Sequence, residues 1–517
     1  MPESLAHPST WTSDKPALLS HDRYAIYNGS LQTPLETDTS SEFRSVDPAT
    51  GIEHPCRIFT SSPKDVAAAV SSAEAAFPEW KSTTPSHRAA ILMRAAALLR
   101  ELNDVLAEVE TRDTGRAFSE TSAVDVPSGV EVMEYCASFV AGGGLDGRTV
   151  KLREDAWVYE TKDPIGVCAG IGAWNYPLQI AIWKSAPCLA AGNAMVYKPS
   201  EVTSLHAALL ASIYSAAGVP SGVFNVVYGA GAVGAQLTSH PGIGKVSFTG
   251  QVATGRKVAK AAGEGMKYVT AELGGKSPLI ICDDVDIETA VDGAMMANFY
   301  STGQVCTNGT RVYVHRSIAK RFEEILLQKM EHIRFGDVMD EKSNMGPLVS
   351  KEHFEKVIGY IKHGIEVDKA KLLYGGLETP QIDDKFKGGY WVKPTVFTNC
   401  TDSMKIVREE IFGPVMSILL YDTTDEAIRR ANDTELGLAG GVFTKDVNRA
   451  HKIAGQLEAG IIWINTWGES PAEMAVGGWK MSGVGVENGR KGIEAWTRGK
   501  STLVDMSGQV PTAFSKL

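Results

Sequence analysis

Hydrophobic periodicity in the first part of the chain predicts helices. Residues 1 to about 45 are rich in Ser, Thr and Pro and look loosely ordered at first, then extended. Ser62 followed by Pro63 is a helix start signal, because a serine can cap the first turn and proline fits the first helical position. The Ala-rich run that follows stops near Trp80, and a longer amphipathic segment covers about 86–112. These patterns predict two successive helices.

From about residue 165 the pattern changes to short β-branched runs alternating with helices. Runs occur at 194–197, 223–227 and 245–248, and the helix between the first two has one apolar face. Strands about 25 residues apart with helices between them indicate βαβ units and a parallel sheet. A second βα series runs from 278 to 466. The pattern therefore predicts an α/β protein with two such series.

Two further strand-like stretches fit neither series. They are 149–161, where apolar and polar residues alternate, and 500–506 near the C-terminus. Projecting strands of this type often pair across subunits, so we expect a homo-oligomer, either a homodimer or a homotetramer.

Composition narrows the function classes. A chain of 517 residues is long enough for two or three domains. Its net charge of −10 and its lack of a long basic run make nucleic acid or an anionic membrane a poor partner. It contains no run of 18 apolar residues, so we expect no membrane-spanning helix.

Cysteine and histidine usage gives no sign of a metal site. The 7 cysteines are odd in number and scattered without a CxxC pair, which argues against a disulfide framework or a zinc site. Asp283, Asp284, Asp286 and Glu288 could be taken for a metal cluster. We interpret them instead as a helix N-terminus, where carboxylates favour the dipole, and expect no metal.

The two ends of the chain differ in what they indicate. The N-terminal segment has acidic residues and no apolar core, so it is not a signal peptide. The chain ends in Ser515-Lys516-Leu517, the tripeptide that the peroxisomal import receptor reads. We therefore expect a peroxisomal protein, or otherwise a cytoplasmic one.

A formal G-x-G-x-x-G occurs at Gly229, Gly231 and Gly234, after one predicted strand and before a helix. This pattern often marks dinucleotide binding. However, the acidic residue expected about 20 positions later is missing, since that region reads Gly242-Ile243-Gly244-Lys245. A glycine-rich turn without a ligand explains the match equally well.

A set of six segments resembles the aldehyde dehydrogenase superfamily. They are Ala173-Trp174-Asn175-Tyr176-Pro177, Lys198-Pro199-Ser200-Glu201, Phe248-Thr249-Gly250, Glu272-Leu273-Gly274-Gly275-Lys276-Ser277-Pro278, Gly303-Gln304-Val305-Cys306 and Glu409-Glu410-Ile411-Phe412-Gly413-Pro414. The resemblance covers about 46–506, and its glutamate and cysteine lie 306 − 272 = 34 residues apart.

The resemblance implies the catalytic residues, and their chemistry fits. Cys306 is the expected nucleophile, because a thiolate forms an adduct with an aldehyde and later leaves readily. The amide of Asn175 and the Cys306 N–H are expected to bind the oxyanion. Glu272 matches the base that activates the hydrolytic water, and Glu473 matches an acidic residue that some members use in proton relay.

The resemblance also implies NAD as cofactor. Lys198 and Glu201 match the residues that bind the adenine ribose, and Glu201 should repel the 2′-phosphate of NADP. Glu410 matches the residue that holds the nicotinamide ribose. Thr249-Gly250 opens a helix whose N–H groups would face the pyrophosphate. Gln251 departs from the usual small residue there. The expected cofactor-binding set also contains Trp174, Gly231, Leu273 and Phe412.

Further segments look like betaine aldehyde dehydrogenases in particular, among them 465–474 and 487–490. The resemblance to these enzymes implies that Tyr176, Trp183 and Trp467 surround a quaternary ammonium group of the substrate. Tyr300 is expected to form a further wall of the substrate site. A quaternary ammonium has no N–H to donate, so aromatic faces must recognise it. Ordinary core packing of these aromatic residues is the alternative.

Taken with the patterns above, the resemblance implies an NAD-binding Rossmann-like domain, an α/β catalytic domain and a small β oligomerisation element. The expected ranges are an N-terminal extension at 1–26, the NAD-binding domain at 27–142 and 165–274, the catalytic domain at 275–480, and the oligomerisation element with the tail at 143–164 and 481–517. The expected reaction is oxidation of betaine aldehyde to glycine betaine. The alternatives are a dehydrogenase of a longer ω-trimethylammonio or ω-amino aldehyde such as 4-trimethylaminobutyraldehyde, a Cys306 hydrolase and a non-catalytic protein on this fold.

Overall fold

The computed structural model describes residues 8–11, 15–36 and 42–510. The predicted targeting tripeptide Ser515-Lys516-Leu517 lies outside the described residues, so peroxisomal import stays a prediction. Within the described ranges, none of the helices combines the length and apolar character needed to cross a membrane.

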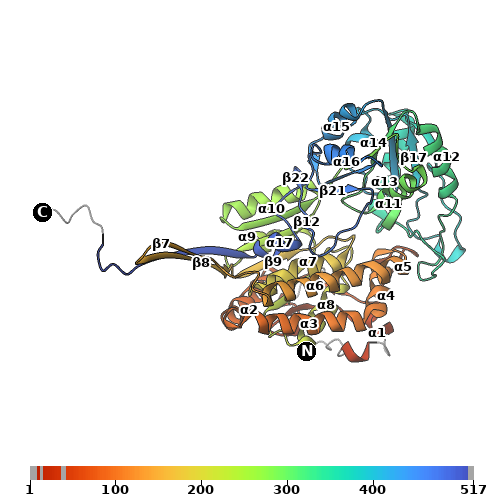
Figure 1. The fold of residues 1–517 in the computed structure, drawn as a ribbon. Helices are drawn as coiled ribbons and strands as arrows, with labels where there is room; N and C mark the ends of the chain where they lie inside the picture. The colour runs from red at the N-terminus through yellow and green to blue at the C-terminus, as the bar shows by residue number, and fades with distance from the viewer. Residues whose placement is uncertain (1–7, 12–14, 37–41, 511–517) are drawn as a thin grey trace.

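The first of two large sheets has eight strands and a parallel centre (Figure 1). Strands β11, β10, β9, β12 and β13 run parallel, and β1 and β23 pair antiparallel near the edges. In spatial order the strands are β2 (Ser30–Gln32), β1 (Ala25–Tyr27), β11 (Phe224–Val226), β10 (Ala194–Lys198), β9 (Val167–Ile171), β12 (Lys245–Gly250), β13 (Tyr268–Leu273) and β23 (Gly483–Val484). The three runs that predicted parallel strands are confirmed as β10, β11 and β12.

Helices cover both faces of this sheet. One apolar core joins the sheet to α2 (Pro63–Ser82), α9 (Gly231–Ser239) and α10 (Val252–Glu264). The core on the other face contains α7 (Pro177–Ala190) and α8 (His206–Ala217), with α3 (Pro85–Glu101), α4 (Asn103–Thr114) and α6 (Val126–Ala141) packed against them. Ser62 caps α2, because its side chain accepts the Asp65 N–H and the Asp65 carboxylate accepts the Ser62 N–H. The single helix predicted over 86–112 is instead two helices, separated at Leu102, whose ψ of 13° departs from the helical value.

The second large sheet has seven strands, all parallel except an edge strand. In order they are β16 (Lys371–Tyr374), β17 (Thr395–Thr398), β18 (Val415–Tyr421), β15 (Arg311–His315), β14 (Pro278–Ile281), β20 (Ala439–Phe443) and β21 (Ile461–Ile464). Helices α11 (Ile287–Phe299) and α12 (Ala319–Met330) pack in one apolar core of this sheet. A second core contains α13 (Lys351–Glu366), α14 (Lys405–Arg408), α15 (Thr424–Asn432) and α16 (Val447–Ala454).

The acidic stretch that precedes α11 is a helix N-terminus, as predicted. The Asp286 side chain caps this helix by accepting the Thr289 N–H at 3.0 Å. Across 8–11, 15–36 and 42–510, no three His, Cys, Asp or Glu side chains are grouped in a way that could hold a metal ion.

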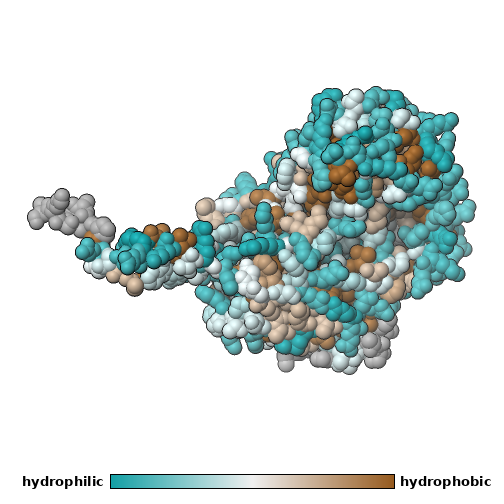
Figure 2. Space-filling model, in the orientation of Figure 1, coloured by the Kyte–Doolittle hydropathy of each residue, from teal (hydrophilic) through white to brown (hydrophobic). Residues whose placement is uncertain are grey.

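The two stretches that fitted neither series form an arm that projects from the body of the molecule (Figure 1). This arm is a three-stranded antiparallel sheet of β7 (Thr149–Arg153), β8 (Ala156–Pro164) and β24 (Thr497–Asp505). Its space-filling surface carries apolar residues among hydrophilic ones (Figure 2). The prediction of two β-rich stretches is confirmed. The domain boundaries stay a prediction, and β23, within the segment expected for the oligomerisation element and tail, pairs with the first large sheet.

Short elements complete the described chain. They are η1 (Pro8–Thr10), α1 (Lys15–Ser20), β3 (Glu42–Phe43), β4 (Val46–Asp47), β5 (Ile52–Glu53), β6 (Ile58–Phe59), α5 (Phe118–Glu120), η2 (Thr121–Asp125), η3 (Tyr300–Gly303), η4 (Asp384–Phe386), β19 (Leu436–Gly437), β22 (Trp479–Lys480) and α17 (Gly489–Glu494).

Candidate active site

A cavity of about 200 Å³ is lined by the ends of β12 and β13 in the first large sheet and by helices and loops on either side of them. The end of β13, the start of α7 and the loop between α11 and β15 all contribute to its lining. Fourteen of the residues predicted for the site line it: Trp174, Asn175, Tyr176, Trp183, Thr249, Gly250, Gln251, Glu272, Leu273, Tyr300, Cys306, Glu410, Phe412 and Trp467. Residues up to 293 positions apart, Trp174 and Trp467, therefore meet in one place.

Cys306 lies just after the short helix η3, in the loop that precedes β15. It is the one cysteine of the described ranges that is only partly buried, whereas the other six are buried. Burial raises the pKa of its thiol to about 12, and the nearby carboxyls of Glu410 and Glu272 act in the same direction. The thiol is therefore protonated at neutral pH in this state, and its attack requires a group that takes the proton.

Asn175 is held against the cysteine loop. Its side-chain nitrogen donates to the backbone carbonyl of Gln304 at 3.0 Å, and the Asn175 backbone carbonyl accepts from Arg116 at 3.1 Å. An amide nitrogen has two hydrogens, so one remains for a ligand oxygen beside Cys306. This geometry can stabilise the oxyanion of a tetrahedral adduct.

Glu272, near the end of β13, is a buried carboxyl without a hydrogen-bond partner of normal geometry among the described residues. Burial raises the pKa of this carboxyl well above its usual range, and the negative charge of Glu487 adds to the effect, whereas Lys184 opposes it. A carboxyl with a raised pKa that faces the cavity suits general-base chemistry.

The sequence analysis missed a buried ion pair that lies next to this base. The ammonium group of Lys184 on α7 lies 2.6 Å from the Glu487 carboxylate and also donates to the hydroxyls of Ser247 and Thr249. Glu487 lines the cavity and Lys184 is fully buried. A lysine inside the apolar stretch 177–190 was the available signal, because a buried cation requires a partner.

The proposed proton-relay residue lies elsewhere. Glu473 is exposed and is not among the residues that line the cavity. The buried carboxylate beside Glu272 is Glu487 instead, 14 residues further along the chain. Glu473 therefore lies outside the cavity lining, and its relay role stays a prediction.

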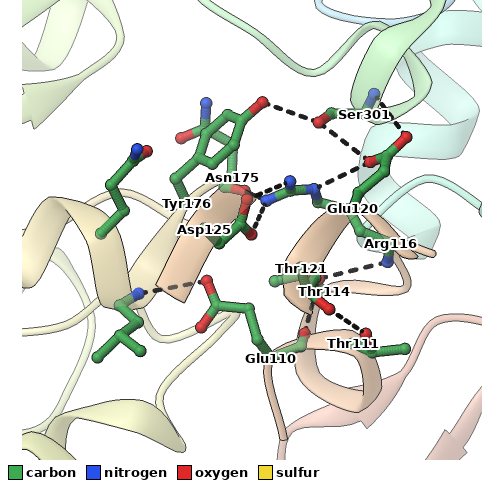
Figure 3. A network of polar contacts seen from close by, with 12 residues as sticks. Glu110, Thr111, Thr114, Arg116, Glu120, Thr121, Asp125, Asn175, Tyr176 and Ser301 are labelled. Carbon is green, nitrogen blue, oxygen red and sulfur yellow. Dashed lines mark hydrogen bonds and ion pairs between the residues drawn. The ribbon is translucent and has the colours of Figure 1, made fainter. Parts of the chain in front are cut away.

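The predicted aromatic residues do line the cavity, but they are not equivalent. The Arg116 guanidinium lies 4.1 Å from the ring centroid of Tyr176, so it occupies one face of that ring (Figure 3). Trp467 packs at 4.9 Å from Trp463, centroid to centroid. The Trp183 indole N–H and the Tyr300 hydroxyl are buried without a hydrogen-bond partner in the described part of the chain.

The cofactor residues predicted near the cysteine form a second wall of the cavity. Trp174 contacts Phe412 edge to face at 5.1 Å, and Phe412 has a φ of 63°. Glu410 is partly buried and accepts the Gly275 N–H at 3.0 Å, and burial raises the pKa of its carboxyl to about 7. Gln251 occupies the N-cap position of α10, but its side chain makes no capping hydrogen bond.

The remaining predicted cofactor residues, Lys198, Glu201 and Gly231, do not line this cavity. The Lys198 ammonium is buried, lies 3.6 Å from the Glu201 carboxylate and donates to the Gly229 carbonyl at 2.6 Å. Gly231 begins α9, and a Cβ there would meet nothing within 4 Å. The glycine-rich turn is therefore joined to Lys198, although it lies apart from the catalytic cavity.

The family model described as the aldehyde dehydrogenase family matches residues 35–502. A betaine aldehyde dehydrogenase from Staphylococcus aureus, solved with NAD+, is 35% identical with a TM-score of 0.91, covering 98% of this chain and 100% of that one. An aldehyde dehydrogenase from Bacillus cereus is 36% identical with a TM-score of 0.90, covering 98% and 100%. An indole-3-acetaldehyde dehydrogenase solved with NAD+ is 34% identical with a TM-score of 0.91, covering 97% and 100%.

These matches span nearly the whole chain and include both large sheets and the cysteine loop. They confirm the predicted resemblance and the mixed α/β fold class. The chain therefore belongs to the aldehyde dehydrogenase family.

Proposed function

We propose that this protein oxidises betaine aldehyde to glycine betaine with NAD, through a thioester on Cys306. The observation that carries the proposal is that one cavity holds the Cys306 thiol, the Glu272 carboxyl and the aromatic rings of Tyr176, Trp183 and Trp467. The family membership supports aldehyde oxidation, and the aromatic lining supports a substrate with a quaternary ammonium group.

The residues of the chain can perform the following steps. Cys306 loses its proton to solvent as its sulfur bonds to the aldehyde carbon. The resulting oxyanion accepts from the Asn175 amide and the Cys306 N–H. When bound, NAD supplies the acceptor for the hydride that leaves this carbon. Glu272 then takes a proton from water as that water attacks the thioester carbon, and the carbon–sulfur bond breaks to return the Cys306 thiolate.

The cofactor is NAD, and the residues present fit it. Glu201 is half-exposed beside Lys198, so its carboxylate can accept from two ribose hydroxyls and would repel a 2′-phosphate. Glu410 keeps acceptor capacity beyond its single N–H partner. The NAD+ bound in two solved relatives supports the same choice.

Cation recognition rests mainly on Trp183 and Trp467. Because Arg116 already covers one face of Tyr176, this ring offers a substrate cation less attraction than a free ring would. The two tryptophans line the cavity, and tryptophan is the best aromatic partner of a cation. The three rings were predicted to act together, and the Arg116 contact makes Tyr176 the weakest of them.

A comparison of betaine aldehyde with its neutral isostere 3,3-dimethylbutanal tests the proposal. Each cation–π contact contributes roughly 0.5–2 kcal/mol. After the cost of dehydrating the cation, we expect kcat/KM to favour betaine aldehyde by about 10- to 100-fold, at 1.4 kcal/mol per decade. Trp467→Ala should reduce this ratio more than it reduces activity on the neutral aldehyde.

Equal kcat/KM values for the two aldehydes would contradict the quaternary-ammonium proposal while leaving the aldehyde dehydrogenase activity intact. A clear preference for 4-trimethylaminobutyraldehyde in the same panel would favour the longer substrate.

A further inference from the structure

The turn that leads into Cys306 has an unusual backbone. Ser301, Thr302 and Gly303 have φ values of 52°, 55° and 74°, three successive residues in the left-handed region. Non-glycine residues rarely adopt this region, and they do so where surrounding contacts hold them. Gly303 must be glycine, because a Cβ there would lie 2.2 Å from the Gly413 carbonyl carbon. The position of Cys306 therefore depends on what holds this turn.

Glu120 on α5 holds the first residue of the turn (Figure 3). One carboxylate oxygen accepts the Ser301 N–H at 3.4 Å, and the other accepts the Ser301 hydroxyl at 3.3 Å. Since that hydroxyl donates to Glu120, it accepts from the Tyr176 hydroxyl, which lies 2.8 Å away. The Glu120 carboxylate is thus linked through Ser301 to Tyr176, which lines the catalytic cavity.

Arg116 holds Glu120 through an ion pair. Its Nε lies 3.6 Å from the Glu120 carboxylate, and its two terminal nitrogens form a forked contact with Asp125. The same guanidinium donates to the Asn175 carbonyl and lies over the Tyr176 ring. The buried Arg116 side chain therefore contacts the Asn175 backbone and the Tyr176 ring. It also pairs with Glu120, which holds the turn before Cys306.

Neither Glu120 nor Arg116 lines the catalytic cavity, so neither touches the reacting atoms. We propose that Glu120 is a positioning residue, which acts through Ser301 to hold the thiol of Cys306 in line with the oxyanion site at Asn175. The proposal rests on the proposed function of Cys306 as the nucleophile. An ionised Glu120 is required, because a neutral carboxyl loses the ion pair to Arg116 and accepts the Ser301 donors more weakly.

The groups around Glu120 set the pH at which its carboxyl ionises. Burial raises the pKa of Glu120 to about 7, the negative charge of Asp125 acts in the same direction, and Arg116 and the Ser301 hydrogen bonds oppose them. The pairing contacts are therefore complete above about pH 7 and are lost as the pH falls through that value.

The reactivity of the Cys306 thiol tests the proposal without any substrate. Wild-type enzyme and Glu120→Gln are treated with iodoacetamide from pH 6 to 9, and alkylation of the Cys306 peptide is followed by mass spectrometry. In parallel, the NADH burst and the KM values for NAD and aldehyde are measured. At pH 8 we expect the burst rate constant of Glu120→Gln to be about 10- to 100-fold lower, because small displacements of a reacting group cost this much. The KM for NAD should stay within roughly 3-fold, since only the thiol is displaced.

Asp113→Asn is the matched control. Asp113 is also a buried carboxyl that accepts a hydroxyl, from Ser45, and a backbone N–H, from Leu205, but it contacts none of the site residues. The Asp113→Asn variant should lower the melting temperature about as much as Glu120→Gln does, but it should not slow the NADH burst. A distinctive sign is that the ratio of wild-type to Glu120→Gln rates narrows below about pH 7, where wild-type Glu120 also becomes neutral.

The outcomes separate the possible failures. A Glu120→Gln burst rate equal to the wild-type rate, or an equal loss in Asp113→Asn, would overturn the positioning role. If Glu120→Gln does not fold, Ser301→Ala removes the hydroxyl link alone and must show the same slowing. A Cys306→Ala variant that still turns over aldehyde would instead refute the proposed function.

Discussion

At the scale of single residues, Glu272 combines a cost in stability with a role in catalysis. Its carboxyl is buried without a well-formed hydrogen bond in the described chain, and its pKa is raised well above the usual range by burial. Below about pH 4.5 the folded and unfolded chains both hold this proton. As the pH rises further, the unfolded chain releases the proton first, so the free energy of unfolding falls until the folded pKa is reached.

Glu272→Gln should remove this component of the pH dependence. We expect its melting temperature, relative to wild type, to increase between pH 5 and pH 9, since each unit of pKa difference corresponds to about 1.4 kcal/mol. Calorimetry at several pH values measures the effect, and Glu264→Gln, at an exposed carboxyl on α10, is the control. The same variant should give a burst of NADH followed by a stalled steady state, because deacylation lacks its base. Unchanged turnover would mean that another group serves as base.

At the scale of elements, the N-terminus of α10 is the clearest departure from a well-capped helix. Gln251 has the extended backbone of an N-cap residue, with φ −71° and ψ 146°, but its side chain accepts none of the first-turn N–H groups. These N–H groups are the donors that a pyrophosphate would use. The long side chain also lines the cavity, so a bound cofactor must order or displace it.

Gln251→Ser should therefore have two separable effects. The serine hydroxyl can cap α10 and stabilise the protein by about 0.5–1 kcal/mol. Removing the long side chain should lower the Kd for NAD by roughly 2- to 10-fold, because a rotamer-rich side chain costs about 0.5–1.5 kcal/mol to order. Gln251→Ala is the matched variant, which should share the tighter NAD binding without the gain in melting temperature. Weaker binding in both variants would show that the glutamine contacts the cofactor. Fluorescence titration and calorimetry measure the two effects.

At the scale of the whole molecule, the arm projects from the rest of the protein, so other parts of the chain leave its apolar residues exposed. Val158 on β8 pairs with Val150 on β7 and with Leu503 on β24, so these side chains form one row across the three strands. Leu503 is 61% exposed and Val150 is 41% exposed. Apolar rows of this kind on a projecting sheet are typical of interfaces, and a second copy of this chain is the expected partner.

Leu503→Asp should dissociate the oligomer, because an aspartate in this row places an unpaired charge at the subunit interface. Light scattering on a sizing column at micromolar concentration measures the mass. Met266→Asp adds the same charge at an apolar residue that is 91% exposed outside the arm, and its φ of 50° is one that aspartate tolerates. That control should keep the mass of the wild-type protein. An unchanged mass for Leu503→Asp would place the subunit interface elsewhere.

Features that depend on near neighbours could be predicted from the sequence. The Ser62 cap, the β-branched runs and the acidic start of α11 are local, because helix caps and strand periodicity involve residues only a few positions apart. The motifs around Cys306 and Glu272 carry the family resemblance for the same reason, since each is a short contiguous segment. Fold class, cofactor class and the candidate nucleophile all follow from such segments.

The charge pairs inside the protein were decided by tertiary structure alone. Lys184 and Glu487 are 303 residues apart, and neither has a local feature that names its partner. Glu473 and Glu487 are both acidic residues in the same C-terminal region, and only the path of the chain buries one and leaves the other exposed. Arg116 likewise becomes a contact of Tyr176 and Glu120 only after the helices have packed. The energy of a charge depends on its burial and its neighbours in space, and these are fixed by the packing of distant segments.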